Sequence, residues 1–260
     1  MLRIILVVLL VGVAGAACKS GGASDSRDAT PVSDEAFLWA AQQAVNASLI
    51  TENDLPANFD LTTGGDENQE ETEPEFLLTG ECAEFNEQFN SNVDGNWRNS
   101  VAESETGDFE DPDGDEFSSS AAAFRDASAA DAEAGDMDRF FDTCTEQFET
   151  QFVQYLGGYL QEVALEEGKA VLDVSTEVTE ISVPSQGDWS HAVRMDMTFT
   201  VDGLPVRLVS DTVTVRVGRM VGSVDATYTG ELEASLEAQR DGIVAIMADR
   251  LAAENAKLPG

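Results

Sequence analysis

Residues 193–201 alternate strictly between apolar and polar side chains, and this pattern constrains the fold more than any other feature. The apolar positions are Val193, Met195, Met197, Phe199 and Val201. Successive side chains of a strand point to opposite faces, so the pattern predicts a half-buried β-strand. Asp202-Gly203 follows directly and predicts a hairpin turn. The sequence therefore predicts an antiparallel sheet that begins with this strand.

Further segments are expected to extend this sheet. They are residues 101–108, 117–124, 174–183, 206–217 and 220–228, with Gly218-Arg219 as a second turn. Within 206–217 the apolar phase shifts from Val206 and Leu208 to Val209 and Val213, which predicts a β-bulge around Leu208–Ser210. A short strand and a turn are also expected over residues 49–59.

Four segments have the apolar spacing or capping of helices. They are residues 33–47, 76–89, 129–163 and 231–256, the third of them interrupted at Gly157-Gly158. Strands and helices together predict an α+β fold, in which an antiparallel sheet packs against helices in a single domain over residues 33–256.

The first seventeen residues have the layout of a signal peptide. Arg3 precedes the apolar run Ile4–Val13, and small residues follow up to Cys18. The run is shorter than the roughly 20 residues that span a bilayer. The segment before Cys18 resembles a bacterial lipobox, which implies that Cys18 carries a lipid. Residues 18–32 are then a flexible spacer.

Two locations are consistent with this N-terminus. A lipid on Cys18 would hold the protein at the outer face of the cytoplasmic membrane. Cleavage by ordinary signal peptidase after Ala14-Gly15-Ala16 would instead release a soluble secreted protein.

Two cysteines remain once Cys18 is assigned to the lipid. Exported proteins meet an oxidising environment, so Cys82 and Cys144 are expected to form a disulfide. Closing a loop of about 60 residues stabilises by roughly 4 kcal/mol on the chain-entropy model. The alternative is a pair of buried free thiols. A zinc site is disfavoured because His191 is the only histidine and no CxxC occurs.

The chain carries 50 acidic and 14 basic residues, a formal net charge of −36. This charge disfavours nucleic acid and anionic lipid surfaces as partners. The acids are dispersed along the chain, and lysine is scarce. Such a surface is typical of proteins that work in high salt, where counterions screen the self-repulsion.

One acidic run was tested as a calcium site. Asp111, Asp113 and Asp115 supply oxygen ligands at close spacing. As an EF-hand loop the run fails, because its sixth position is Glu116 rather than glycine. A hydrated acidic loop is the preferred interpretation, with Asp111, Asp113 and Asp115 kept as a weak calcium candidate.

No catalytic or cofactor motif is present in the sequence. His191 has no nucleophile elbow to serve, and it is interpreted as a histidine at a strand edge or turn. P-loop and dinucleotide fingerprints are missing as well. Trp39, Trp97 and Trp189 are expected in the core, with the lining of a groove as the alternative. We therefore expect no enzyme activity and no cofactor.

The order of these features resembles a known group of proteins. The lipobox and spacer, Asp54-Leu55-Pro56, the paired cysteines and the segment VRVGRMVGSV at Val215–Val224 are similar to those of uncharacterised actinobacterial lipoproteins. These in turn are similar to the extracellular sensor domains of mycobacterial receptor-type Ser/Thr kinases. The resemblance implies an α+β domain with a groove between sheet and helices that holds a small ligand.

Two functions follow as hypotheses. The first is a membrane-tethered, non-enzymatic protein that binds or senses a small or envelope-derived ligand. The second is a structural or assembly factor of the envelope that acts through protein contacts, which predicts an exposed apolar patch of several hundred Å².

Overall fold

The computed structural model describes residues 34–62, 77–86, 97, 99–166 and 170–259. The predicted signal peptide, Cys18 and the predicted spacer lie outside these residues. Within them, no helix combines the length and the apolar character that crossing a bilayer requires.

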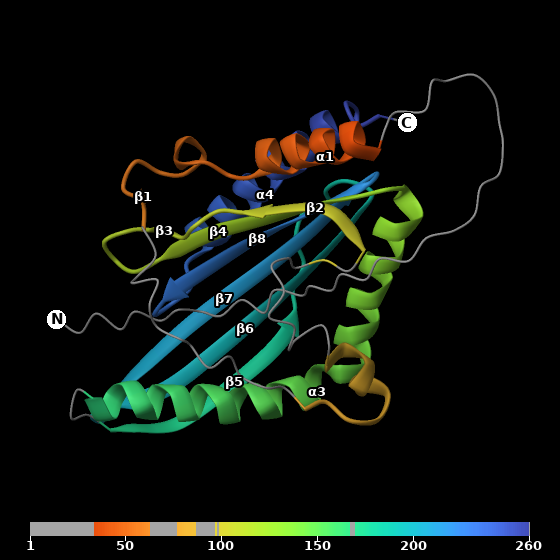
Figure 1. Cartoon of the computed structure of the whole chain (residues 1–260). Coiled ribbons are helices and arrows are strands. Elements are labelled where there is room, and N and C mark those ends of the chain that lie inside the picture. Colours follow the sequence, from red (N-terminus) through yellow and green to blue (C-terminus); the bar gives the residue numbers. More distant parts are fainter. Residues whose placement is uncertain (1–33, 63–76, 87–96, 98, 167–169, 260) are drawn as a thin grey trace, which may run out of the picture.

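Eight strands form one antiparallel sheet in the order β1-β3-β4-β8-β7-β6-β5, with β2 paired to β4 (Figure 1). The strands are β1 Asp60–Leu61, β2 Ser100–Glu105, β3 Phe109–Glu110, β4 Glu116–Phe124, β5 Val171–Glu180, β6 Trp189–Val201, β7 Leu204–Val217 and β8 Met220–Thr229. This sheet packs against helices and confirms the predicted α+β fold and its C-terminal meander.

The β6–β7 hairpin has the predicted two-residue turn. Val201 pairs with Leu204, and Asp202 and Gly203 both have positive φ, at 50° and 80°. Two successive positive φ values are the geometry of the hairpin turn whose twist matches that of the flanking strands.

The bulge predicted around Leu208–Ser210 is wrong. Pairing of β7 runs without a register shift against both β6 and β8. The apolar phase shifts because β7 is covered on opposite faces at its two ends. Leu208 packs in one core cluster with α3, whereas Val209 and Val213 pack on the other face in a second cluster. The shift therefore marks a change of covering layer, not an irregular strand.

Within the described residues, five helical segments accompany the sheet. They are α1 Asp34–Ser48, the 3₁₀ helices η1 Glu52–Asp54 and η2 Gly80–Phe85, α3 Ala127–Glu166 and α4 Ala234–Asn255. The short strand predicted within residues 49–59 is wrong, because η1 forms there instead. The Asp54 carboxylate accepts hydrogen bonds from the backbone N–H (2.7 Å) and hydroxyl (2.8 Å) of Thr51 and closes this turn.

Helix α3 passes through Gly157-Gly158 without the predicted interruption. Figure 1 instead shows the helix bent well before these glycines, into one arm beside the sheet and another beneath β5. Near the bend, the Thr145 hydroxyl donates a hydrogen bond to the Phe141 carbonyl at 2.6 Å. Such back-bonding by Thr to the preceding turn often bends helices.

The two faces of the sheet are buried by different helices. Helices α1 and α4 cover one face, which we call the α1/α4 face; it carries the alternate β8 residues Met220, Gly222, Val224, Ala226 and Tyr228. Gly222 lets α4 approach closely, since a Cβ there would lie 2.4 Å from the Met247 methyl carbon. The other face, the α3 face, carries the remaining β8 residues and faces the two arms of α3.

Candidate functional site

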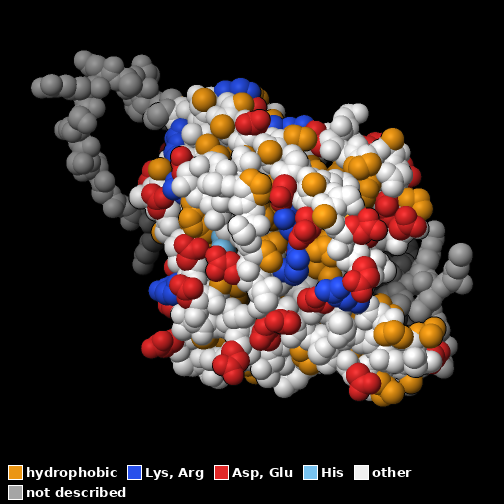
Figure 2. All heavy atoms as spheres, turned by 180° about the vertical axis from the view of Figure 1, so that it is seen from behind, with side chains coloured by type: hydrophobic (Ala, Val, Ile, Leu, Met, Phe, Trp, Pro, Cys, Tyr) orange, Lys and Arg blue, Asp and Glu red, His pale blue; other side chains and the backbone are white. Residues whose placement is uncertain are grey.

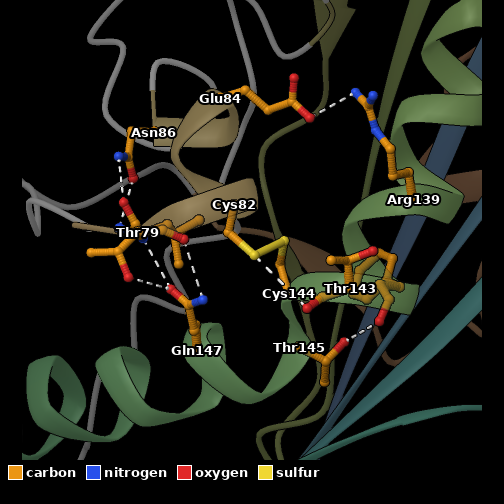
Figure 3. Close-up of a disulfide and its surroundings, with 11 residues drawn as sticks. Thr79, Cys82, Glu84, Asn86, Arg139, Thr143, Cys144, Thr145 and Gln147 are labelled. Carbon is orange, nitrogen blue, oxygen red and sulfur yellow. Dashed lines mark hydrogen bonds and ion pairs between the residues drawn. A yellow bond between two sulfur atoms is a disulfide. The ribbon is translucent and has the colours of Figure 1, made fainter.

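A disulfide between Cys82 and Cys144 joins η2 to α3 and confirms the predicted pair. The cysteines are 62 residues apart in sequence, and their Cα atoms lie 5.7 Å apart. Both are buried, with 2% and 0% exposure. Figure 3 shows the bond at the point where α3 bends. The disulfide therefore fixes η2 against the helix at its bend.

Side-chain amides hold the chain before η2 in place as well. Gln147 accepts from the Thr79 N–H at 3.0 Å and donates to the Thr79 carbonyl at 3.3 Å (Figure 3). Gln151, one helical turn further, makes the same pair of bonds with Leu77 at 2.6 and 2.7 Å. The backbone N–H and C=O groups of residues 77 and 79 face the same side of an extended segment. Two glutamines that are four residues apart, and so lie on one face of α3, can therefore bond to both residues. The segment is thus bonded to α3 much as a strand is bonded in a sheet.

A groove of about 430 Å³ lies between η2 and α3 beside the disulfide. Its lining residues are Gly80, Glu81, Glu84, Phe85, Arg139 and Thr143. The sequence suggested a groove between sheet and helices, and this one has a 3₁₀ helix as its second wall. Ligand sites commonly span about 300–1,000 Å³, so the groove has room for a small molecule.

Arg139 is the basic residue that lines this groove. Its guanidinium contacts Glu84 at 3.2 Å and Asp136 at 2.9 Å, and it lies over the Phe85 ring, 5.3 Å from the ring centroid. Phe85 is 1% exposed, whereas the Arg139 side chain is 50% exposed. The face of an aromatic ring and neighbouring carboxylates both attract a cation. The groove therefore contains a preformed site for a cation.

The α3 face of the sheet has a second unusual feature, a polar centre. Aligned residues of neighbouring strands form three rows: His191, Thr214, Ser223 and Ser120; Thr212, Asp225 and Ser118; Ser210, Thr227 and Glu116. We call these the polar rows. The Thr212 hydroxyl donates to Asp225 at 2.7 Å, and the Thr227 hydroxyl donates to Ser210 at 3.3 Å. Hydrogen bonds of this kind offset the cost of burying polar groups.

Two carboxyls of the polar rows have perturbed pKa values. Burial raises the pKa of Asp225 to about 7, with a further contribution from the Asp108 carboxylate, against the hydrogen bond from Thr212. Burial also raises the pKa of Glu116 to about 7, helped by Asp108 and Glu110. Desolvation disfavours the charged form of an acid, and like charges add to it. Both groups therefore take up protons near neutral pH.

The opposite, α1/α4 face holds its buried charge differently. Asp211 is fully buried and accepts two hydrogen bonds from Arg194, both at 2.7 Å, and another from Arg240 of α4. Arg194 also reaches Glu237 at 2.9 Å. This network is a structural link between β7 and α4, since every charge in it is partnered.

His191 lies within β6, opposite Thr214, rather than at a turn. It is buried between Phe141 and Trp189, with ring centroids 4.9 and 6.0 Å away. Its Nε2 atom is 4.0 Å from the Glu180 carboxylate.

The three tryptophans lie in different environments. Trp97 is in the core as expected, and Trp189 is half-buried. Trp39 is 69% exposed on α1, contrary to the core prediction.

The acidic loop 111–115 closes the β3–β4 hairpin. Asp111 Oδ1 accepts hydrogen bonds from the backbone N–H of Asp113 (2.8 Å) and Asp115 (3.1 Å), and Asp115 accepts from Thr229 N–H at 3.1 Å. In the part of the chain that the structure describes, no three His, Cys, Asp or Glu side chains are placed to hold a metal ion together. Calcium binding by Asp111, Asp113 and Asp115 therefore has no support in this geometry.

Comparison with known proteins gives two loose structural similarities. No family model matches the chain, and neither does any curated protein. The extracellular domain of PknH from Mycobacterium tuberculosis aligns over 56% of this chain and 62% of its own length, with 13% identity and a TM-score of 0.28. A putative uncharacterised protein of Mycobacterium smegmatis (Rv0999 ortholog) aligns over 85% and 100%, with 14% identity and a TM-score of 0.33.

Neither similarity is strong enough to carry a ligand or an activity to this chain. Both neighbours are mycobacterial proteins and one is an extracellular domain, which matches the sequence-based resemblance only loosely. The case for a functional site therefore depends on the groove and the polar rows themselves.

Sequence reasoning missed the groove residues Glu81, Glu84 and Arg139. They are charged residues among many others, and the two segments that carry them lie far apart in sequence. The polar rows left a clearer signal. Ser, Thr and Asp recur at every second position in three strands, for example Ser210, Thr212 and Thr214.

Proposed function

We propose that this protein is an exported, membrane-tethered domain that binds a small ligand in the groove between η2 and α3 and performs no chemistry on it. The tether is a lipid on Cys18, and residues 18–32 are the spacer. The signal peptide and small residues before Cys18 support the tether, and the groove supports the binding role.

The observation that carries the binding role is a groove whose walls are fixed before any ligand arrives. The Cys82–Cys144 bond and the paired amides of Gln147 and Gln151 hold one wall to the other. A preformed site loses little conformational entropy on binding, which favours affinity. The groove also combines an aromatic ring with a few charged groups, as ligand sites commonly do.

A structural or assembly role is the alternative, and one observation favours it. Leu38 and Trp39 are both exposed on α1, at 41% and 69%. The other large exposed apolar residues of the described chain are Leu61, Leu77, Leu172 and Leu204, on separate segments. Scattered apolar residues are normal on protein surfaces, and a docking patch is contiguous. Ligand binding is therefore the better supported function.

Native mass spectrometry of the full chain, purified gently from the membrane fraction, tests the binding role. We expect a co-purified small molecule that is lost from Thr143→Trp, which fills the groove. Thr150→Trp is the matched control, because Thr150 is also an exposed threonine of α3 but does not line the groove. Equal occupancy in both variants would reject the groove as the site.

Intact mass and fractionation test the tether separately. We expect the mature protein to begin at Cys18 with the added mass of acyl chains, and Cys18→Ala to leave the membrane fraction. An unmodified N-terminus at a residue other than Cys18 would instead identify a secreted protein.

A further inference from the structure

We infer that the ligand of the groove carries a guanidinium or ammonium group, and that Arg139 occupies the place of this cation in the free protein. The inference rests on the proposed binding function and adds the chemical class of the ligand.

The geometry around Arg139 supplies the argument. Its guanidinium contacts Glu84 and Asp136 and covers the face of Phe85. An aromatic face combined with carboxylates is how proteins recognise organic cations. Phe85 itself is held by an edge-on contact with Phe140, 5.3 Å between ring centroids. The ring and the carboxylates would keep their places if Arg139 swung away.

Arg139 is well suited to be displaced. Its side chain and that of Glu84 are both about half exposed, at 50% and 52%. Exposed ion pairs of this kind contribute little, because water and salt screen them and long side chains lose entropy. A ligand cation can therefore replace the guanidinium without breaking a buried ion pair.

The charge of the lining points to the same class of ligand. Of the lining residues that the structure describes, Glu81 and Glu84 are acidic and Arg139 is the one of opposite sign. Among the described residues, no cation is paired with Glu81. An added ligand cation would thus find a carboxylate that Arg139 does not neutralise.

Arg125 offers a matched comparison elsewhere on the surface. Its side chain is also 50% exposed, it pairs with Asp34 at 2.8 Å, and it lies 5.2 Å from the Phe37 ring centroid. Arg125 does not line the groove. A second guanidinium, that of Arg219, also lies over Phe37 at 5.6 Å. Removing Arg125 therefore changes the net charge as removing Arg139 does, but it does not vacate the cation site of the groove.

The test measures binding of agmatine, which has a guanidinium at one end and an ammonium at the other, to the full chain by calorimetry. Salt near physiological ionic strength limits non-specific attraction to the acidic surface to about 8 Å. We expect Arg139→Met to bind agmatine about tenfold more tightly than the unmodified protein. Glu84→Gln added to Arg139→Met is expected to remove this gain, and Arg125→Met to leave the affinity unchanged.

Two results would overturn the inference. One is an Arg139→Met variant that binds no more tightly than the unmodified protein. The other is an equal gain in Arg125→Met, which would assign the effect to net charge. Arg139→Lys is the second variant if Arg139→Met fails to fold; it keeps the charge but loses the planar group, and a gain of at least twofold is expected.

The same measurements distinguish this inference from the proposed function. If Arg139→Met shows no gain but Thr143→Trp still loses a co-purified molecule, the groove binds a ligand of another class. If neither variant differs from its control, the binding function fails together with the inference.

Discussion

Replacing Asp225 by Asn is expected to change how the stability of this protein depends on pH. Asp225 is 9% exposed in the centre of the polar rows, and its pKa is raised from 3.8 to about 7. In the unfolded chain its pKa returns to about 4. Above pH 7 the folded state must therefore hold a buried negative charge that water solvates in the unfolded state. Asn keeps the shape and the acceptor for Thr212 but carries no charge.

The magnitude follows from the shift. About three pKa units at about 1.36 kcal/mol each give a penalty near 4 kcal/mol at pH 8 in the unmodified protein. At pH 5 the folded state is protonated and the remaining penalty is about 1.5 kcal/mol. Because the pKa of Asp225 is higher in the folded state than in the unfolded state, the contribution of Asp225 to the free energy of unfolding rises as the pH falls. The advantage of Asp225→Asn should therefore shrink by about 2–3 kcal/mol from pH 8 to pH 5.

Urea unfolding followed by far-UV circular dichroism at constant ionic strength measures this difference. Groups with lowered pKa values, such as Asp54 and Asp196, lose their contribution only below about pH 4 and do not disturb this window. Glu116 has a pKa that is also raised to about 7 and titrates in both proteins, so the comparison subtracts its effect. If the difference in free energy of unfolding between the two proteins stayed the same from pH 8 to pH 5, the reasoning would be refuted.

Asp211→Asn is the contrasting control, because Asp211 is buried in the neighbouring strand but on the opposite face. Its charge is paired with Arg194 and Arg240. Removing it leaves two guanidinium groups without their shared partner, so a loss of about 3–5 kcal/mol is expected at neutral pH. Two buried aspartates should thus respond with opposite signs to the same substitution.

The remaining predictions concern packing, the disulfide and salt. Gly222→Val should destabilise by about 1–3 kcal/mol in urea unfolding, because its side chain would collide with Met247 and Leu251 of α4, whereas Gly242→Ala, with open space around it, should not. The double substitution Cys82→Ser and Cys144→Ser should lower the free energy of unfolding by about 4 kcal/mol and weaken ligand binding in the groove. Unchanged stability would contradict the role of the disulfide in fixing η2 against α3. The melting temperature should rise from low to molar NaCl, since acidic side chains are spread over the surface (Figure 2), and a flat response would reject adaptation to salt.

The sheet could be predicted from the sequence because its signal is local. Alternation in residues 193–201 and the Asp202-Gly203 turn define strands and a hairpin without reference to the rest of the chain. The bulge prediction failed because it assumed one covered face for the whole of β7. To predict which face of β7 is buried at each end, one must know which helix covers that end. The alternation of apolar and polar residues does not carry this information.

The groove could not be predicted for a related reason. Its walls come from η2 and the middle of α3, and the two are joined by a bond between residues 62 positions apart. The pairing of Cys82 and Cys144 was predictable by elimination, but the bend that places Arg139 over Phe85 was not. The predicted break at Gly157-Gly158 put the change of direction in the wrong part of the helix.

Arg219 holds the start of α1 and the last described residues together, which bears on how the protein would be oriented in the proposed tethered state. This turn residue donates hydrogen bonds to the carbonyls of Leu258 and Pro259, and its guanidinium lies over Phe37 near the start of α1. The start of α1 and the last described residues therefore lie at the same end of the sheet. The Asp202-Gly203 turn lies at the other end of β7, about 40 Å away along the strand. In the proposed tethered state, a reporter fused to the C-terminus would therefore lie on the side nearest the membrane, and a tag in the β6–β7 turn on the far side.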